Sequence, residues 1–344
     1  MADVEIPSDL SDELRAAWHR YVDLTAPLRP ALHAYCRRLT GNLWDAEDLV
    51  QDTLLRGFGT LGHVHHAIAS PRAYLLRTAT NLWIDAVRRR VGEAAALAAR
   101  AALPGATAPP DGAVRDVGTA LLARLAPQER AAVVLKELFD ASLDEIALVL
   151  ATTPGAVKSA LHRGREKLRE PEGATEAVSS ARRPRSLPSV ELVDRFVALY
   201  AARDKDGLVA LMLDGGQVEN VGCSMEFGRE QFPSERGWFQ AAVFGHPEWP
   251  PAFQYEDARV ERAIFDGEPI LLGFATRRGK EALEQVLRIE ERDGGIARLR
   301  GYAFCPETVR AVGEALGLPV RTGLYRYPAP APGRNWRDVP RATP

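Results

Sequence analysis

The sequence predicts a multidomain chain, in which two all-α modules, the second a helix-turn-helix, precede an α+β domain. In the first half, apolar residues recur every three or four positions, and proline- and glycine-containing segments interrupt this helical pattern. In the second half, strand-like segments are joined by Asp-Gly turns. The boundaries we expect are 20–92 and 117–170 for the helical modules, 93–116 and 171–187 for linkers, 188–318 for the α+β domain and 319–344 for a proline-rich tail.

The composition excludes several classes of protein. The chain is 46% hydrophobic and 26% charged with a net charge of −2, so it is not a polycation that coats nucleic acid. The acidic, polar N-terminus excludes a secretory signal, and no apolar run approaches the roughly 18 residues of a membrane helix. The three cysteines are far apart and lack metal-ligand spacing. We therefore expect a cytoplasmic protein without disulfides, metal or cofactor.

The first module contains three predicted helices after a polar lead-in over 1–20. The first runs from Tyr21 to Leu39 and ends at Gly41-Asn42. The second, over 42–58, buries an apolar side and exposes an acidic one that is either a solvated helix face or a protein-docking face. Its exposed residues are Asp45, Asp48, Gln51, Asp52 and Arg56.

The third helix opens at Ser70-Pro71, an N-cap followed by proline at the first helical position. Its residues three or four apart form a polar stripe that ends in consecutive arginines. Arginines with aromatic rings beside them are typical of single-stranded DNA binding, although Tyr74 and Trp83 also fit a core position. The candidate DNA-binding residues are Arg77, Asn81, Trp83, Asp85, Arg88, Arg89 and Arg90.

The second module has the spacing of a helix-turn-helix. Pro127 begins a helix, Ser142 and Glu145 form a capping box for the next, and Thr153-Pro154 begin the last. That last helix has one apolar stripe and one basic face, which suits a DNA major groove. The exposed candidates are Lys158, Ser159, His162, Arg163, Arg165 and Lys167.

The final domain is predicted to begin with a helix over 189–204. A tight turn at Asp214-Gly215-Gly216, two hairpins with turns at 266–267 and 293–295, and a helix from Pro306 follow. Its many aromatic residues either line a pocket or fill a core. Its acidic residues and His246 form no compact acid/base pair, so we expect no enzyme.

Three segments together resemble bacterial extracytoplasmic-function sigma factors. They are DAEDLVQDTLLRGF, PRAYLLRTATNLWIDAVRRR and LAPQERAAVVLKELFDASLDEIALVLATTPGAVKSALHRGREKLR, in the family's order and over about the first half of the chain. The resemblance implies that the acidic helix docks on core RNA polymerase. It also implies that the helix over 72–90 captures and melts the −10 promoter element, and that the helix over 154–167 reads the −35 element.

The domain after Pro188 resembles the SnoaL-like cone fold fused to some of these sigma factors. Asp214, Gly215 and Gly216 look like the glycine motif of such extensions, but Gln217-Val218 departs from its usual ending. The resemblance implies that this domain modulates the sigma factor in cis, and it leaves a small-molecule ligand open. The alternatives are a helix-turn-helix regulator with a ligand-sensing domain, and an enzyme on the cone fold.

Overall fold

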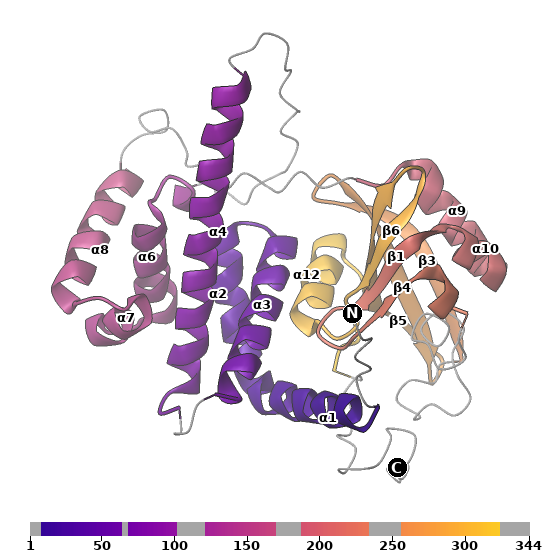
Figure 1. Ribbon diagram of the computed structural model, residues 1–344, viewed down its shortest axis with the longest axis horizontal. Helices are drawn as coiled ribbons and strands as arrows, with labels where there is room; N and C mark the ends of the chain where they lie inside the picture. The colour runs from indigo at the N-terminus through magenta and orange to yellow at the C-terminus, as the bar shows by residue number, and fades with distance from the viewer. Residues whose placement is uncertain (1–7, 64–67, 102–120, 170–186, 234–255, 324–344) are drawn as a thin grey trace, which may run out of the picture. The chain divides into compact units, whose positions relative to one another are not determined.

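The computed structural model describes residues 8–63, 68–101, 121–169, 187–233 and 256–323 (Figure 1). The chain forms two compact units. The helical unit spans Thr25–Arg183, and the second unit combines Met1–Leu24 with Pro184–Pro344. The second unit is therefore built from both ends of the sequence.

The helical unit contains six described α-helices. They are α2 (Arg29–Thr40), α3 (Leu43–Leu61), α4 (Pro71–Ala101), α6 (Pro127–Phe139), α7 (Leu143–Leu150) and α8 (Pro154–Arg169). The single helix expected over 21–39 is interrupted by a 3-10 turn, η1 (Ala26–Leu28), because prolines at 27 and 30 lack the amide hydrogens that a continuous helix needs. Gly41 ends α2 in the left-handed conformation with φ 85°, as predicted.

The helix-turn-helix of α7 and α8 is confirmed. Ser142 Oγ accepts from the Glu145 amide at 3.2 Å, and Glu145 Oε2 accepts from the Ser142 amide at 2.8 Å, which completes the capping box. Thr153 Oγ1 caps α8 through the Ala156 amide at 3.2 Å. The predicted stripe of α8 is buried at Val157, Ala160, Leu161 and Gly164.

Gly164 lets α8 lie close to α6. A β-carbon at this position would lie 2.9 Å from Cγ2 of Val133, which is closer than side-chain carbons pack. The glycine therefore sets the distance between the two helices, and with it the position of the basic face of α8.

The second unit is an α+β layer structure, as predicted. Its helices are α1 (Ser8–Thr25), α9 (Val190–Ala201), α10 (Lys205–Ala210) and α12 (Pro306–Leu316), with η2 (Arg229–Gln231) as a 3-10 turn. Its strands are β1 (Met212–Asn220), β2 (Ser224–Phe227), β3 (Asp257–Phe265), β4 (Glu268–Arg277), β5 (Lys280–Arg292) and β6 (Gly295–Gly301). They form one sheet in the order β2-β1-β6-β5-β4-β3, in which only the β1–β6 pair is parallel.

Two-residue turns with positive φ at both positions join β3 to β4, β4 to β5 and β5 to β6. Asp266-Gly267 and Asp293-Gly294 form two of them, as predicted, and Arg278-Gly279 forms a third. The tight turn expected at Asp214-Gly215-Gly216 is instead an irregularity inside β1. The register there moves from Met212↔Ile296 to Gln217↔Arg298, so the extra residues bulge from the strand.

Helices cover both faces of the sheet. In Figure 1, α9 lies on one side and α12 on the other. Phe196 and Tyr200 of α9 pack in a core with Val260, Leu287 and other inward-facing strand residues.

The polar lead-in expected over 1–20 is wrong from Ser8 onward, because α1 is a helix. The indole Nε1 of Trp18 donates a hydrogen bond to the carbonyl oxygen of Gly222, 3.0 Å away. This contact places the N-terminal helix in the unit formed by the C-terminal half. Sequence periodicity could not show it, because the partner lies 204 residues away.

Several expected features lie outside the described residues. They are the aromatic residues from Trp238 to Phe253, His246, both linker centres and the tail after Gly323. Among the described helices, none is long and apolar enough to cross a membrane. The cysteines at 36, 223 and 305 are free thiols.

We predict that Ala151→Gly stabilises the helical unit. Ala151 connects α7 to α8 with φ 50°, a conformation that glycine adopts at lower cost than alanine. The free energy of unfolding in urea should rise by about 0.5–1 kcal/mol. The same change at Ala156, in the first turn of α8, should lower it by up to about 1 kcal/mol. A loss of stability in Ala151→Gly would contradict the assignment.

Candidate functional site

The acidic side of α3 is a narrower stripe than the sequence indicates. Asp45 and Asp48 are half-buried, whereas Asp52 and Arg56 are exposed. Leu55 lies beside them with 55% of its surface exposed. An acidic stripe next to an exposed leucine is a surface suited to a protein partner.

Gln51 does not belong to this stripe, which corrects the sequence prediction. It is buried, and its Nε2 donates to Oε1 of Glu47 at 2.7 Å. The sequence prediction put Gln51 on the exposed side of α3 together with Asp52. In the structure the side chain of Gln51 lies on the inward side, because Glu47 provides a polar partner there.

Glu47 is a residue that the sequence analysis missed. Its carboxylate is fully buried, accepts a hydrogen bond from Nη2 of Arg29 at 2.7 Å, and lies 3.8 Å from Nε2 of His33. Burial alone would raise the pKa of Glu47, but the charges of Arg29 and His33 and the hydrogen bonds from Arg29 and Gln51 hold this pKa at about 2. The cluster joins α2 to α3 and so positions the acidic stripe. The signal in the sequence is a glutamate between the inward-facing Ala46 and Leu49.

The polar stripe of α4 is exposed, as expected. Arg77, Asn81, Asp85 and Arg88 lie on the surface three or four residues apart. Asp85 pairs weakly with Arg88 at 3.8 Å, and Arg90 Nε donates to the Ala86 carbonyl oxygen at 3.2 Å. Arg89 is exposed as well. This surface offers several cations to a polyanion.

Trp83 is not part of that surface. Its exposed fraction is 4%, since it lies on the inward side of α4 with Leu76 and Ala79. The guanidinium of Arg130 on α6 covers the ring at 5.7 Å from its centre. In this arrangement the ring is a core residue, and the exposed aromatic surface expected next to the arginines is absent at this position.

The same arginine connects the two helical modules. Arg130 Nε donates to the carbonyl oxygen of Arg38 on α2 at 2.9 Å. The rings of Tyr35 on α2 and Phe139 on α6 meet edge to face, 5.9 Å apart. The two modules therefore share a core within the helical unit, although the sequence between them has the composition of a linker.

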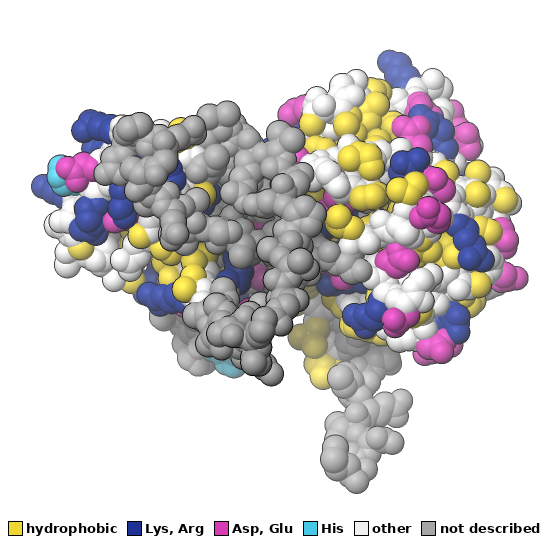
Figure 2. Space-filling model, turned by 90° about the horizontal axis from the view of Figure 1, so that it is seen from above, with side chains coloured by type: hydrophobic (Ala, Val, Ile, Leu, Met, Phe, Trp, Pro, Cys, Tyr) yellow, Lys and Arg dark blue, Asp and Glu magenta, His cyan; other side chains and the backbone are white. Residues whose placement is uncertain are grey.

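The exposed side of α8 carries the predicted polar residues. Lys158, Ser159 and His162 lie on the surface, with Ser159 and His162 bonded only to groups of their own helix among the described residues. In Figure 2, Lys and Arg side chains gather at the left edge of the face shown, on the side where Figure 1 places α8. The amino-terminal half of this helix thus presents a basic, hydrogen-bonding surface.

Two arginines of α8 contact acids of α6 instead of standing free. Arg163 Nε pairs with Glu129 at 3.0 Å, and Arg165 Nη2 pairs with Glu137 at 2.6 Å. Lys167 also reaches Glu129, at 2.7 Å. Burial would raise the pKa of Glu129, but hydrogen bonds from Lys167 and Arg163 hold it below its usual value. Part of the basic face therefore fastens α8 to α6.

The glycine motif of the second unit lies on β1. Asp214 is exposed and pairs with Nη2 of Arg229. Nη1 of the same arginine donates to the Met212 carbonyl oxygen and so holds η2 against β1. A β-carbon on Gly216 would lie 2.8 Å from the Leu213 carbonyl oxygen, so the bulge requires glycine there. These contacts hold the 3-10 turn η2 against β1, the strand next to the edge strand β2.

Comparison with known proteins places these surfaces in a family. Residues 24–92 match Sigma-70 region 2, and residues 119–168 match Sigma-70, region 4. The ECF RNA polymerase sigma factor SigG of Mycobacterium tuberculosis H37Rv is 31% identical over 281 residues, covering 71% of this chain and 70% of SigG. This chain belongs to the ECF RNA polymerase sigma factors. SigE of Mycolicibacterium smegmatis is 33% identical over 163 residues, covering 45% of this chain and 63% of SigE.

Solved structures of sigma factors overlap more loosely. The match to SigJ of Mycobacterium tuberculosis covers 84% of this chain and 98% of the SigJ chain, at 22% identity and a TM-score of 0.30. The match to RpoE of Bartonella quintana, solved in complex with the anti-sigma factor NepR, covers 43% of this chain and 94% of the RpoE chain. The identity is 24% and the TM-score is 0.35. Both scores are low, so membership rests on the sequence relatives. As a sigma factor, the chain binds core RNA polymerase and directs promoter-specific initiation of transcription.

We predict that Glu47→Gln destabilises the helical unit and flattens its pH dependence. The pKa of Glu47 is depressed in the folded state, so its stabilising contribution is complete above the usual value of 4.5 and disappears as pH falls to about 2. Near neutral pH the variant should lose about 3 kcal/mol of unfolding free energy, because Arg29 stays buried without its counter-charge. Urea unfolding between pH 2.5 and 7 measures both effects. Glu137→Gln, on the surface, is the matched control, and equal pH profiles for wild type and Glu47→Gln would contradict the prediction.

Proposed function

We propose that the exposed faces of three helices perform the three tasks of this sigma factor. The α3 stripe of Asp45, Asp48, Asp52 and Arg56 binds core RNA polymerase. The α4 stripe of Arg77, Asn81, Asp85, Arg88, Arg89 and Arg90 binds the −10 element. The α8 face of Lys158, Ser159, His162, Arg163 and Arg165 binds the −35 element. The observation that carries the proposal is that each face is exposed or partly exposed in the region where the family match lies.

Gln51 and Trp83 were predicted as binding residues, but both are buried and so are not part of these proposed binding faces. Gln51 supports the docking stripe by holding Glu47. Trp83 supports the −10 surface by packing α4 against α6, and it would reach DNA only if α6 moved away. Both are positioning residues in the proposed function.

Affinity and specificity come from different side chains in this proposal. Arg88, Arg89 and Arg90 contact phosphates, which makes binding depend on salt but not on sequence. Lys158, Ser159 and His162 contact base edges from the amino-terminal half of α8. Arg163 and Arg165 serve phosphates, provided that they leave Glu129 and Glu137. Since both DNA-binding helices are carried on one polymerase, their weak contacts add.

We predict that Lys158→Ala weakens promoter recognition at one base position. Loss of its contact should cost about 1–3 kcal/mol with the preferred base at that position and much less with other bases. Binding of the polymerase–sigma complex to promoter fragments with single substitutions in the −35 element measures the difference. Lys136→Ala is the control, because Lys136 lies on α6, where it pairs with Asp140 just after that helix. If Lys158→Ala discriminates among the substituted promoters like the wild type, Lys158 does not read bases.

The second unit is proposed to modulate the sigma factor in cis, as the resemblance to cone-shaped extensions implies. The supporting observation is connectivity. This unit contains both the chain before Thr25 and the chain after Arg183, so it is joined covalently to each end of the helical unit. One junction is the turn η1 between α1 and α2, and the other is the segment 170–186. A unit attached at both ends restricts the separation of the two helical modules.

We predict that releasing both junctions changes transcription. A protease site inserted between 171 and 187 opens one, and Trp18→Ala weakens the other by removing the contact of α1 with Gly222. Run-off transcription from the cognate promoter, with limiting sigma factor, should differ by several-fold between the cleaved Trp18→Ala protein and the intact wild type. Cleaved wild type and uncleaved Trp18→Ala should give intermediate yields. Equal yields in all four samples would show that the second unit does not modulate initiation.

A further inference from the structure

A cavity lies between α9 and the sheet of the second unit. Its non-atom space is about 680 Å³ when the open solvent at its mouth is included, so the enclosed part is much smaller and takes only a small ligand. Aromatic and aliphatic side chains form much of its wall. They are Phe196 and Tyr200 from α9, Val218 from β1, Val260 from β3, Leu287 from β5 and Leu299 from β6.

Two glycines leave space at the floor of this cavity. Gly273 on β4 pairs with Gln285 on β5, and Gly301 on β6 pairs with Asn220 on β1. A β-carbon on Gly301 would lie 2.7 Å from Gln285 Nε2 and 3.0 Å from Asn220 Oδ1. The two side-chain amides therefore converge over Gly301, in space that any larger residue would fill.

These two amides have no hydrogen-bond partner in the part of the chain that the structure describes. Asn220 is nevertheless 96% buried, since only 4% of its surface is exposed. Neither amide is among the described polar atoms that are closed off from solvent, so their open hydrogen-bonding groups face the cavity. Both amides line the cavity, so a molecule inside it would supply the missing partners.

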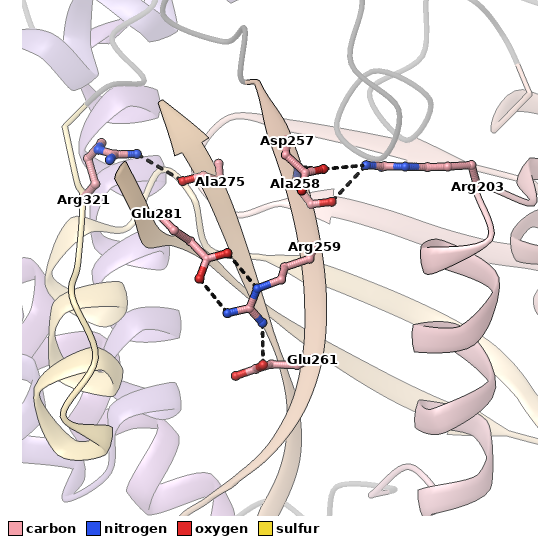
Figure 3. Close-up of polar contacts among 8 residues, drawn as sticks. All are labelled: Arg203, Asp257, Ala258, Arg259, Glu261, Ala275, Glu281 and Arg321. Carbon is pink, nitrogen blue, oxygen red and sulfur yellow. Dashed lines mark hydrogen bonds and ion pairs between the residues drawn. The ribbon is translucent and has the colours of Figure 1, made fainter. Parts of the chain in front are cut away.

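The charged side chains around the cavity are already paired. Arg259 binds Glu281 at 2.7 Å and Glu261 at 2.5 Å, as Figure 3 shows. Glu284 pairs with Arg277 at 2.8 Å and with Arg321 at 2.6 Å.

Glu219, the remaining charged residue of the lining, is paired as well. Arg298 and Arg300 contact it at 2.5 and 2.9 Å. Among the described lining residues there are two neighbouring amides and no uncompensated charge. This favours an uncharged ligand, because an ion would lose its hydration without gaining a counter-charge.

We propose that this cavity binds a small uncharged molecule whose flat edge carries a hydrogen-bond donor next to an acceptor, such as a carboxamide, lactam or imide on an apolar ring. The edge pairs with the amides of Asn220 and Gln285, and the ring packs against Phe196 and Tyr200. The proposal concerns binding and stands whether or not the second unit modulates transcription.

Fluorine NMR titration of the full chain with 4-fluorobenzamide tests the site. The fluorine signal should broaden and shift saturably, with a dissociation constant in the millimolar range expected for so small a probe. The isosteric anion 4-fluorobenzoate should bind at least about tenfold more weakly, because it places a charge between neutral amides. A wild-type chain that does not bind 4-fluorobenzamide, or that binds 4-fluorobenzoate equally well, overturns the proposed ligand class.

Substitutions of the two amide residues test whether 4-fluorobenzamide binds in this cavity. Gln285→Met and Asn220→Leu keep approximate side-chain size and remove one amide each, so each should weaken 4-fluorobenzamide about tenfold. Gln217→Met on β1 lies outside the lining and should bind like the wild type. Circular dichroism confirms that each variant is folded. If both folded cavity variants bind with wild-type affinity, the amides over Gly301 are not the site.

Discussion

The Arg130 guanidinium holds together the parts of the helical unit that carry its functional faces. It covers Trp83 of α4 and donates to the Arg38 carbonyl oxygen of α2, so one side chain of α6 fixes two helices of the first module. Because α6 also supports α8 through Val133 and Glu129, the position of the basic face follows from the same helix. The surfaces proposed for the two promoter elements are thus coupled through a shared core.

Local signals in the sequence predicted much of this fold. The capping box of Ser142 and Glu145, Thr153 before Pro154, and the Asp266-Gly267 turn each depend on residues close in sequence. For such features the chemistry of a few neighbours determines the backbone. The same holds for the exposed stripe of α4, where helical spacing alone places the arginines on one side.

The sequence predictions were wrong where the position of a residue depends on a partner far away in the sequence. Gln51 is buried against Glu47, whose carboxylate is itself held in the interior by Arg29, 18 residues earlier in the chain. Trp83 is buried because α6 covers it, and α1 is ordered with the second unit because Gly222 lies beside Trp18. The cavity amides belong to the same class, because the strand register that joins Asn220, Gly301 and Gln285 is not visible in any one segment.

Because the second unit is built from both ends of the chain, its two parts are synthesised at different times. A ribosome delivers α1 first and its contact residue Gly222 only after the whole of Thr25–Arg183. Since domains generally fold as units while the chain emerges, the helical unit can form before Gly222, the contact of α1, has been synthesised. Every nascent molecule therefore passes through a stage in which the sigma-factor helices are complete and the remainder of the protein is not.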